Sequence, residues 1–122
     1  MKKPLAQQKP RQYVFDANGQ ILGRFATKVA IHVRGKMEPN FSSNTLPQIY
    51  VIIKNIDKLS ISDKKMNSHV VIHFTGYPGG LRRKLWNEAY TSNPKKFFLR
   101  VVRYMLPKNR QAAKLLKFIK FE

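Results

Sequence analysis

A glycine-rich segment followed by cations is the part of the sequence best suited to chemistry with an anion. Gly76–Gly80 contains three glycines, and Arg82, Arg83 and Lys84 follow it. Glycine lets a backbone approach a phosphate closely, and arginine and lysine supply bidentate and point-charge contacts. An ordinary turn beside a solvated charge run has the same composition, and residue types alone favour neither interpretation. The GxxxxGK[ST] spacing of a nucleotide-binding P-loop is missing.

Three aromatic residues near this segment have side chains that can also contact a nucleic acid. They are Phe74, Tyr77 and Trp86. An aromatic ring can stack on an unpaired base. Aromatic residues beside helices more often belong to the core, so stacking is the second interpretation here.

Further cations lie at the ends of predicted helices. Lys108, Asn109 and Arg110 stand between two of them, where the positive end of a helix dipole favours phosphate. A simple stop and restart of the helix explains these residues equally well. Arg24 lies near the start of the first predicted helix, and Arg34-Gly35-Lys36 lies at its end. For this helix the overall charge favours contact with an anion over plain solvation.

No set of residues is arranged for catalysis or metal binding. His32, His69 and His73 match no metal-ligand spacing, and carboxylates are sparse. Ser62 and Asp63 with His69 do not lie in a nucleophile elbow. The sequence therefore predicts neither an enzyme nor a metal or cofactor site.

The charge of the chain is strongly one-sided. It has 122 residues, with 24 Lys and Arg against 6 Asp and Glu, and a net charge of +18. Residues 81–122 hold twelve of the cations and two of the acids. A solvated surface usually mixes both signs, so this part of the chain is predicted to contact a polyanion.

Composition also excludes several classes of protein. The longest apolar run, Ile49–Ile53, is too short to span a bilayer, and cysteine is absent, so disulfides and thiolate sites are excluded.

Residues 1–12 are polar and basic. They predict a flexible basic arm without a secretory signal, although an acid-free start is weakly compatible with organelle import.

Hydrophobic periodicity predicts alternating strands and helices in one domain over residues 13–122. Ile49–Ile53 is apolar at every position, which is typical of a strand covered on both faces. We predict a three-layer α/β/α sandwich with a small, mainly parallel four-stranded sheet. The predicted strands are 13–16, 49–53, 58–62 and 70–74, and the predicted helices are 22–34, a stretch reaching Thr91, a helix starting at Pro94 after the cap Asn93, and one starting near Asn109.

Five segments, in order, resemble those of the universal large-subunit ribosomal protein thirteen family in its bacterial or organellar form. The match runs from about Tyr13 to Phe121. It implies an α/β/α fold, binding to large-subunit ribosomal RNA, a role in early subunit assembly and no catalysis. The segments are Tyr13–Ala17 with Leu22-Gly23-Arg24, Arg34-Gly35-Lys36, Val51–Asn55, Thr75–Leu81 and Met105–Asn109.

The chain departs from the family pattern at several places. Ser43–Ile49 replaces a loop that contains Pro-His and a Gly-Asp step, and Ser62-Asp63 stands where Thr-Gly is usual. Phe74 takes the place of a histidine, and the C-terminal extension is short. These changes put RNA contacts of residues 42–47 and of the C-terminus in doubt.

The sequence therefore predicts a structural RNA-binding protein of the cytoplasmic ribosome, with an organellar ribosome less favoured. Its expected partners are large-subunit ribosomal RNA and neighbouring large-subunit proteins, with no membrane, no small-molecule substrate and no homo-oligomer. The alternative is a free-standing nucleic-acid-binding regulator, although no helix-turn-helix or zinc finger is present. The predicted RNA contacts are Arg24, Lys28, Arg34, Lys36, Tyr77, Gly79, Gly80, Arg82, Arg83, Lys84, Lys108, Asn109, Arg110 and Lys114.

Overall fold

The first strand begins where a flexible arm was expected to end. The computed structural model describes residues 10–122, so most of the predicted arm, 1–9, lies outside the described residues. Strand β1 (Arg11–Asp16) takes up the last two positions of that arm. Arg11 forms an ion pair with Glu38, and Tyr13 donates a hydrogen bond to the same carboxylate at 2.9 Å. Pairing of Arg11 and Gln12 with Ile49 and Tyr50 of the neighbouring strand extends β1 beyond its apolar residues.

The central sheet has three parallel strands, not the four that were predicted. Strand β2 (Ile49–Lys54) lies between β1 and β5 (Ile119–Phe121). The missing member, β3 (Val70–Phe74), pairs instead with β4 (Leu81–Leu85) in an antiparallel hairpin. Two strands separated by a short loop can pair directly with each other, whereas a parallel partner needs a long crossover.

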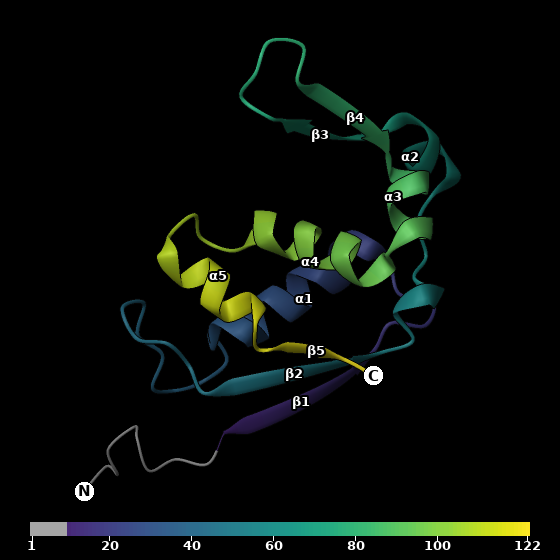
Figure 1. Cartoon of the computed structure of the whole chain (residues 1–122). Helices are drawn as coiled ribbons and strands as arrows, with labels where there is room; N and C mark the ends of the chain where they lie inside the picture. Colours follow the sequence, from purple (N-terminus) through teal and green to yellow (C-terminus); the bar gives the residue numbers. More distant parts are fainter. Residues whose placement is uncertain (1–9) are drawn as a thin grey trace, which may run out of the picture.

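All the helices that pack on this sheet cover the same face, so the predicted third layer is wrong. Phe15 and Phe121 lie on either side of Ile53 in the sheet. Phe15 contacts Phe25 of α1 (Leu22–Arg34), and Phe121 contacts Phe98 of α4 (Pro94–Met105). Figure 1 shows α1, α4 and α5 (Arg110–Leu116) together above the strands. The strand order advances in one direction, so right-handed crossovers place every connection on one side.

The opposite face of the sheet is only partly covered. Val14 is 57 % exposed, while Tyr50 and Ile52 are half-buried. Lys120 places its ammonium 4.8 Å from the ring centre of Tyr50. The apolar run of β2 was predicted to be buried on both sides, and it is fully buried only at alternate positions.

The core lies between β2 and the helices. Phe98, Ile53, Val29, Val51 and Val102 are fully buried in it. They come from helical positions three or four residues apart and from alternate strand positions, as the periodicity predicted. Helix α1 has the predicted bounds, and Pro94 stands at the first turn of α4 as expected.

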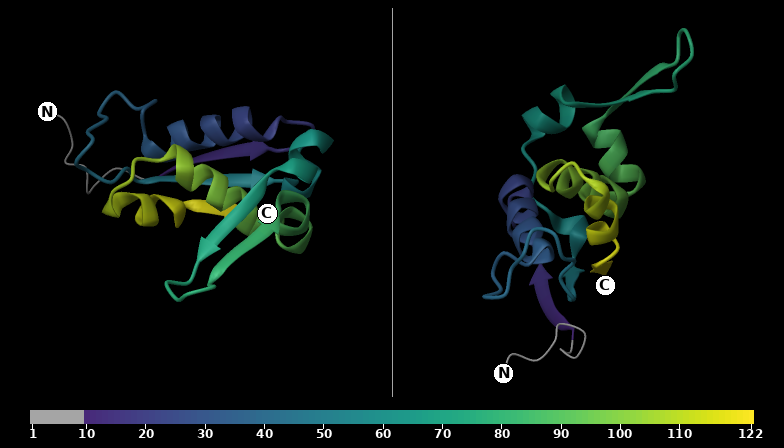
Figure 2. Two further views of the ribbon diagram at one scale, coloured as in Figure 1. Left: turned by 90° about the horizontal axis from the view of Figure 1, so that it is seen from above. Right: turned by 90° about the vertical axis from the view of Figure 1, so that its left-hand side faces the viewer.

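The segment between β2 and the hairpin forms short helices. The predicted strand at 58–62 is absent; the chain forms a 3₁₀ turn, η2 (Ile56–Lys58), and Ser60 makes an isolated bridge to Ile21. Helix α2 (Asp63–Ser68) precedes the hairpin and α3 (Trp86–Ser92) follows it. Figure 2 shows the hairpin extending away from the body of the protein. No helix among residues 10–122 is long and apolar enough to cross a membrane.

Candidate nucleic-acid interface

The β3–β4 hairpin separates charge from apolar surface. Strand register pairs His73 with Arg82 and Val71 with Lys84. Side chains alternate between faces along a strand, so these four residues share one face, which we call the cationic face. Arg83 falls on the other face, which we call the apolar face. That face contains Val70, Ile72, Phe74, Leu81, Arg83 and Leu85, all exposed. The three successive cations therefore do not act together.

The glycines at the hairpin tip serve the turn itself. Gly76 and Gly79 have φ angles of 89° and 73°. A Cβ on Gly80 would lie 1.9 Å from Thr75 Oγ1 and 2.9 Å from the Tyr77 carbonyl oxygen. The turn therefore needs Gly80 for packing, and its backbone tip with Tyr77, 77 % exposed, remains open to contact.

The cations of α1, and Lys36 just beyond its C-terminal end, point away from the core. Arg24, Lys28 and Lys36 are exposed, and Arg34 is half-buried. Lys28 Nζ lies 5.0 Å from the ring centre of Phe15, and the Arg34 guanidinium lies 5.7 Å from that of Phe41. These contacts hold the side-chain stems while the charges stay at the surface.

The junction between α4 and α5 supplies a second group of exposed cations. Lys108, Arg110 and Lys114 are exposed. Asn109 caps α5, because its side-chain oxygen accepts hydrogen bonds from the backbone N–H groups of Gln111 and Ala112 at 3.1 and 3.2 Å. The predicted contact residue Asn109 thus has a structural task, and the cations beside it are oriented by the helix start that it fixes.

None of these cations forms an ion pair with an acidic residue among residues 10–122. Within the described part of the chain, ion pairs involve only Arg11 with Glu38 and Lys54 with Glu122. The contact with Tyr13 and attraction to Glu38 raise the pKa of Arg11 above its ordinary value. The cations on the hairpin, on α1 and at the α4–α5 junction have no carboxylate in reach, so their charge is directed at solvent or at a polyanion.

Asp16 closes a turn rather than taking part in chemistry. Its Oδ1 accepts hydrogen bonds from the Asn55 side chain and the Asn18 backbone N–H, each at 3.0 Å. Hydrogen bonds from Asn55 and then Asn18, with help from Lys58 and Lys54, lower the pKa of this carboxyl. Asn55 has a left-handed backbone, φ 56°.

The histidines lie apart from one another. His32 packs edge-on against Tyr13 and Phe15, His69 packs against Trp86, and His73 lies on the hairpin. No group of three potential metal ligands occurs among residues 10–122.

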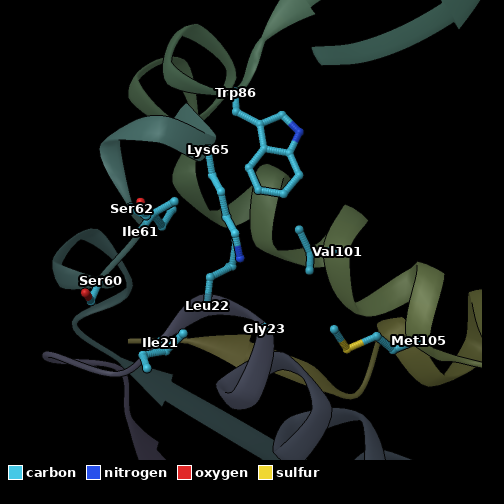
Figure 3. A pocket seen from close by; sticks show the side chains of 10 residues that line it. All are labelled: Ile21, Leu22, Gly23, Ser60, Ile61, Ser62, Lys65, Trp86, Val101 and Met105. Atoms are coloured by element: carbon cyan, nitrogen blue, oxygen red, sulfur yellow. The ribbon is translucent and has the colours of Figure 1, made fainter. Parts of the chain in front are cut away.

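An open cleft lies where α1 begins, beside α2, α3 and α4. It has a volume of about 400 Å³. Figure 3 shows Trp86 and Lys65 extending into it from α3 and α2, with Val101 and Met105 on the α4 side. The sequence did not predict that Lys65 lines this cleft, nor that His73 lies beside Arg82 on the hairpin. Residues 81–85 read Leu-Arg-Arg-Lys-Leu, without the apolar-polar alternation typical of a strand, so the sequence carried no clear signal for the second.

The fold and this surface define the class of the protein: a small basic α/β protein whose unpaired cations suit a polyanion. A family model described as ribosomal protein L13 matches residues 10–121. The chain belongs to the ribosomal protein L13 family, whose members are structural constituents of the large ribosomal subunit and not enzymes. The predicted family and class of function are thereby confirmed.

Individual relatives agree over most of the chain, and each carries the name large ribosomal subunit protein uL13. The protein of Thermotoga petrophila is 39% identical over 108 residues, which cover 88% of this chain and 72% of the relative. That of Thermus thermophilus is 34% identical, covering 93% and 81%. That of Clostridium novyi is 38% identical, covering 98% and 85%. The family match over residues 10–121 therefore spans the segments that hold the hairpin and the helix ends.

Proposed function

We propose that the chain binds large-subunit ribosomal RNA through three groups of cations and supports early assembly of the subunit. The groups are the cationic face of the hairpin, the exposed cations of α1, and Lys108, Arg110 and Lys114 at the α4–α5 junction. The observation that carries the proposal is that these groups have no carboxylate partner within the described residues. An assembly partner rich in phosphate neutralises them and releases counterions.

The packed core gives these contacts their selectivity. Phosphate contacts carry little sequence information, so RNA is selected by whether its folded shape presents phosphates at the spacing of the three groups. Short helices, caps and a packed aromatic core keep that spacing fixed. The hairpin extends the reach of the protein beyond its core, which fits a protein lying where several RNA helices meet.

The remaining partners and the location follow from the same proposal. Neighbouring large-subunit ribosomal proteins are expected partners, and the chain acts as a single copy in a cytoplasmic ribosome. The named relatives are bacterial proteins of the large subunit, which supports this location over an organellar one.

Sedimentation of a cell lysate on a sucrose gradient tests the proposal. We expect a tagged chain to travel with the large subunit and its precursors, and ultraviolet crosslinking to join it to large-subunit RNA. Roughly 6 to 10 phosphate contacts give a 10³- to 10⁵-fold loss of affinity between 50 and 200 mM salt. Absence from the subunit fractions would favour a free-standing regulator, and a flat salt response would contradict phosphate binding.

A further inference from the structure

The cleft beside α1 combines an apolar lining with one positive charge. Apolar walls come from Leu22, Ile61, Trp86, Val101 and Met105. Among residues 10–122, Lys65 is the one charged residue that lines it, and Ser60 and Ser62 add hydroxyl groups. No carboxylate of this described part lines the cleft, so a ligand that fits it carries negative charge at the Lys65 side and an apolar surface elsewhere.

Trp86 is held firmly at the wall of the cleft. Its ring packs edge-on against His69 at 4.8 Å and against Phe97 at 5.3 Å. Both neighbours are aromatic, and Phe97 belongs to the buried core. The indole stays half-buried, and Figure 3 shows it reaching toward Val101 across the cleft. A fixed, partly exposed indole is a ready surface for stacking.

The opposite wall is fixed as well and leaves space. Thr27 Oγ1 lies 3.4 Å from Met105 Sδ, which joins α1 to the end of α4. Gly23, also in the lining, has no atom within 4 Å of an added Cβ. Ser62 precedes α2 without forming a side-chain cap, so its hydroxyl is available to a ligand.

We propose that this cleft receives one unpaired nucleotide of RNA, with its base against Trp86 and its phosphate near Lys65. The inference rests on the proposed RNA-binding function and assigns it a site for a single base. A volume of about 400 Å³ lies within the usual range of small-ligand pockets. An apolar protein segment would cover Lys65 without supplying a counter-charge, which is unfavourable.

Trp86 is the only tryptophan of the chain, so its fluorescence reports on this cleft directly. The full chain is titrated with a short single-stranded oligoribonucleotide, with an abasic oligomer of the same length and charge, and with a fully paired RNA duplex. Binding of each is measured separately by anisotropy of a labelled RNA. We expect strong quenching of Trp86 by the single strand and little by the abasic oligomer or the duplex.

Two variants and a matched control locate the effect. Gly23→Leu places a side chain in the open space of the cleft and should abolish the quenching, weakening single-strand binding roughly 5- to 150-fold, the contribution of one stacked base. Lys65→Gln should weaken it about 5- to 8-fold at 0.1 M salt through loss of one phosphate contact. The matched control is Lys64→Gln, because Lys64 is an exposed lysine of α2 that does not line the cleft, and it should leave the quenching of Trp86 by the single strand unchanged. Removing a helical glycine does not lower helix propensity, so the fold is retained, as a melting curve will show.

The outcomes separate this inference from the proposed function. Salt-dependent RNA binding with unchanged Trp86 emission, equal quenching by the abasic oligomer, or full quenching in Gly23→Leu would overturn the cleft assignment and leave RNA binding intact. Failure of every RNA to bind would overturn both. A response of Trp86 to purified large-subunit proteins, without a response to RNA, would assign the cleft to a protein partner and overturn the inference.

Discussion

Replacing Arg82 and Lys84 together by glutamine removes the two permanent charges of the cationic face while keeping long polar side chains. Both residues are exposed, and neither forms an ion pair. Lys84 donates one hydrogen bond to Ser92 Oγ at 3.0 Å, which glutamine can partly replace. The substitution therefore tests electrostatic contact with RNA and leaves the core untouched.

The size of the effect follows from counterion release. Each phosphate contact contributes about 0.7 to 0.9 to the slope of log affinity against log salt, so two contacts reduce the slope by about 1.4 to 1.8. If affinity at 1 M salt is unchanged, this corresponds to a loss of roughly 25- to 60-fold at 0.1 M salt.

The assay is binding of a large-subunit RNA fragment at several salt concentrations, with Arg83→Gln as the matched control. Arg83 lies next to both residues in sequence and on the apolar face in the structure. We expect Arg83→Gln to keep the original slope. An unchanged slope in the double variant would refute phosphate contact at the cationic face, and an equal change in Arg83→Gln would refute the division of the hairpin into two faces.

Three further predictions concern stability and are checked by thermal or urea unfolding. Gly80→Ala should lower stability by more than about 1 kcal/mol, because the new Cβ collides with Thr75 Oγ1 and the Tyr77 carbonyl. Asn109→Ala should cost about 0.5 to 2 kcal/mol through loss of the α5 cap. Asp16 has a lowered pKa in the fold, so it stabilises the protein above the ordinary carboxyl pKa of about 3.9, and this contribution disappears as the pH falls through the lowered value. The Asp16→Asn variant should therefore lose less stability than the original chain when the pH falls below about 4.

Each of these has a result that would contradict it. Gly79→Ala tests backbone strain alone, because nothing lies within 4 Å of its added Cβ, so a larger cost there than at Gly80 would be inconsistent with a steric clash. Asn109→Ser should retain much of the cap, and a loss equal to that of alanine would argue against capping. An Asp16→Asn variant with the acid sensitivity of the original chain would show that the Asn55 and Asn18 hydrogen bonds do not couple to folding.

Local features of the fold were predictable because neighbours in sequence decide them. The apolar spacing of residues 22–34 fixes α1, and Gly35 ends it with φ 80°. Asn93 and Pro94 begin α4, and Asn109 begins α5. These signals depend on backbone geometry and on side chains within a few residues, so a single sequence is enough to read them.

The pairing of strands was not predictable in the same way. Val70–Phe74 is apolar enough to join the central sheet, yet it forms a separate hairpin in which several large apolar side chains stay exposed. Whether such a strand is buried depends on which other strand it meets. The predicted third layer was likewise not predictable, because it requires a crossover on the second face of the sheet.

For the candidate interface, the sequence by itself determined the sign and amount of charge, the cations that helices keep out of the core, and the family through its ordered motifs. Only the tertiary structure decided which cations act together. It placed Arg83 on the face of the hairpin that is opposite to the face with Arg82 and Lys84. It used Asn109 as a helix cap and brought Lys65 and Trp86 into one cleft with Gly23. Net charge and hydrophobic periodicity can be read from the order of residues along the chain. A contact surface depends instead on the direction of each side chain, and strand register and helix packing determine that direction.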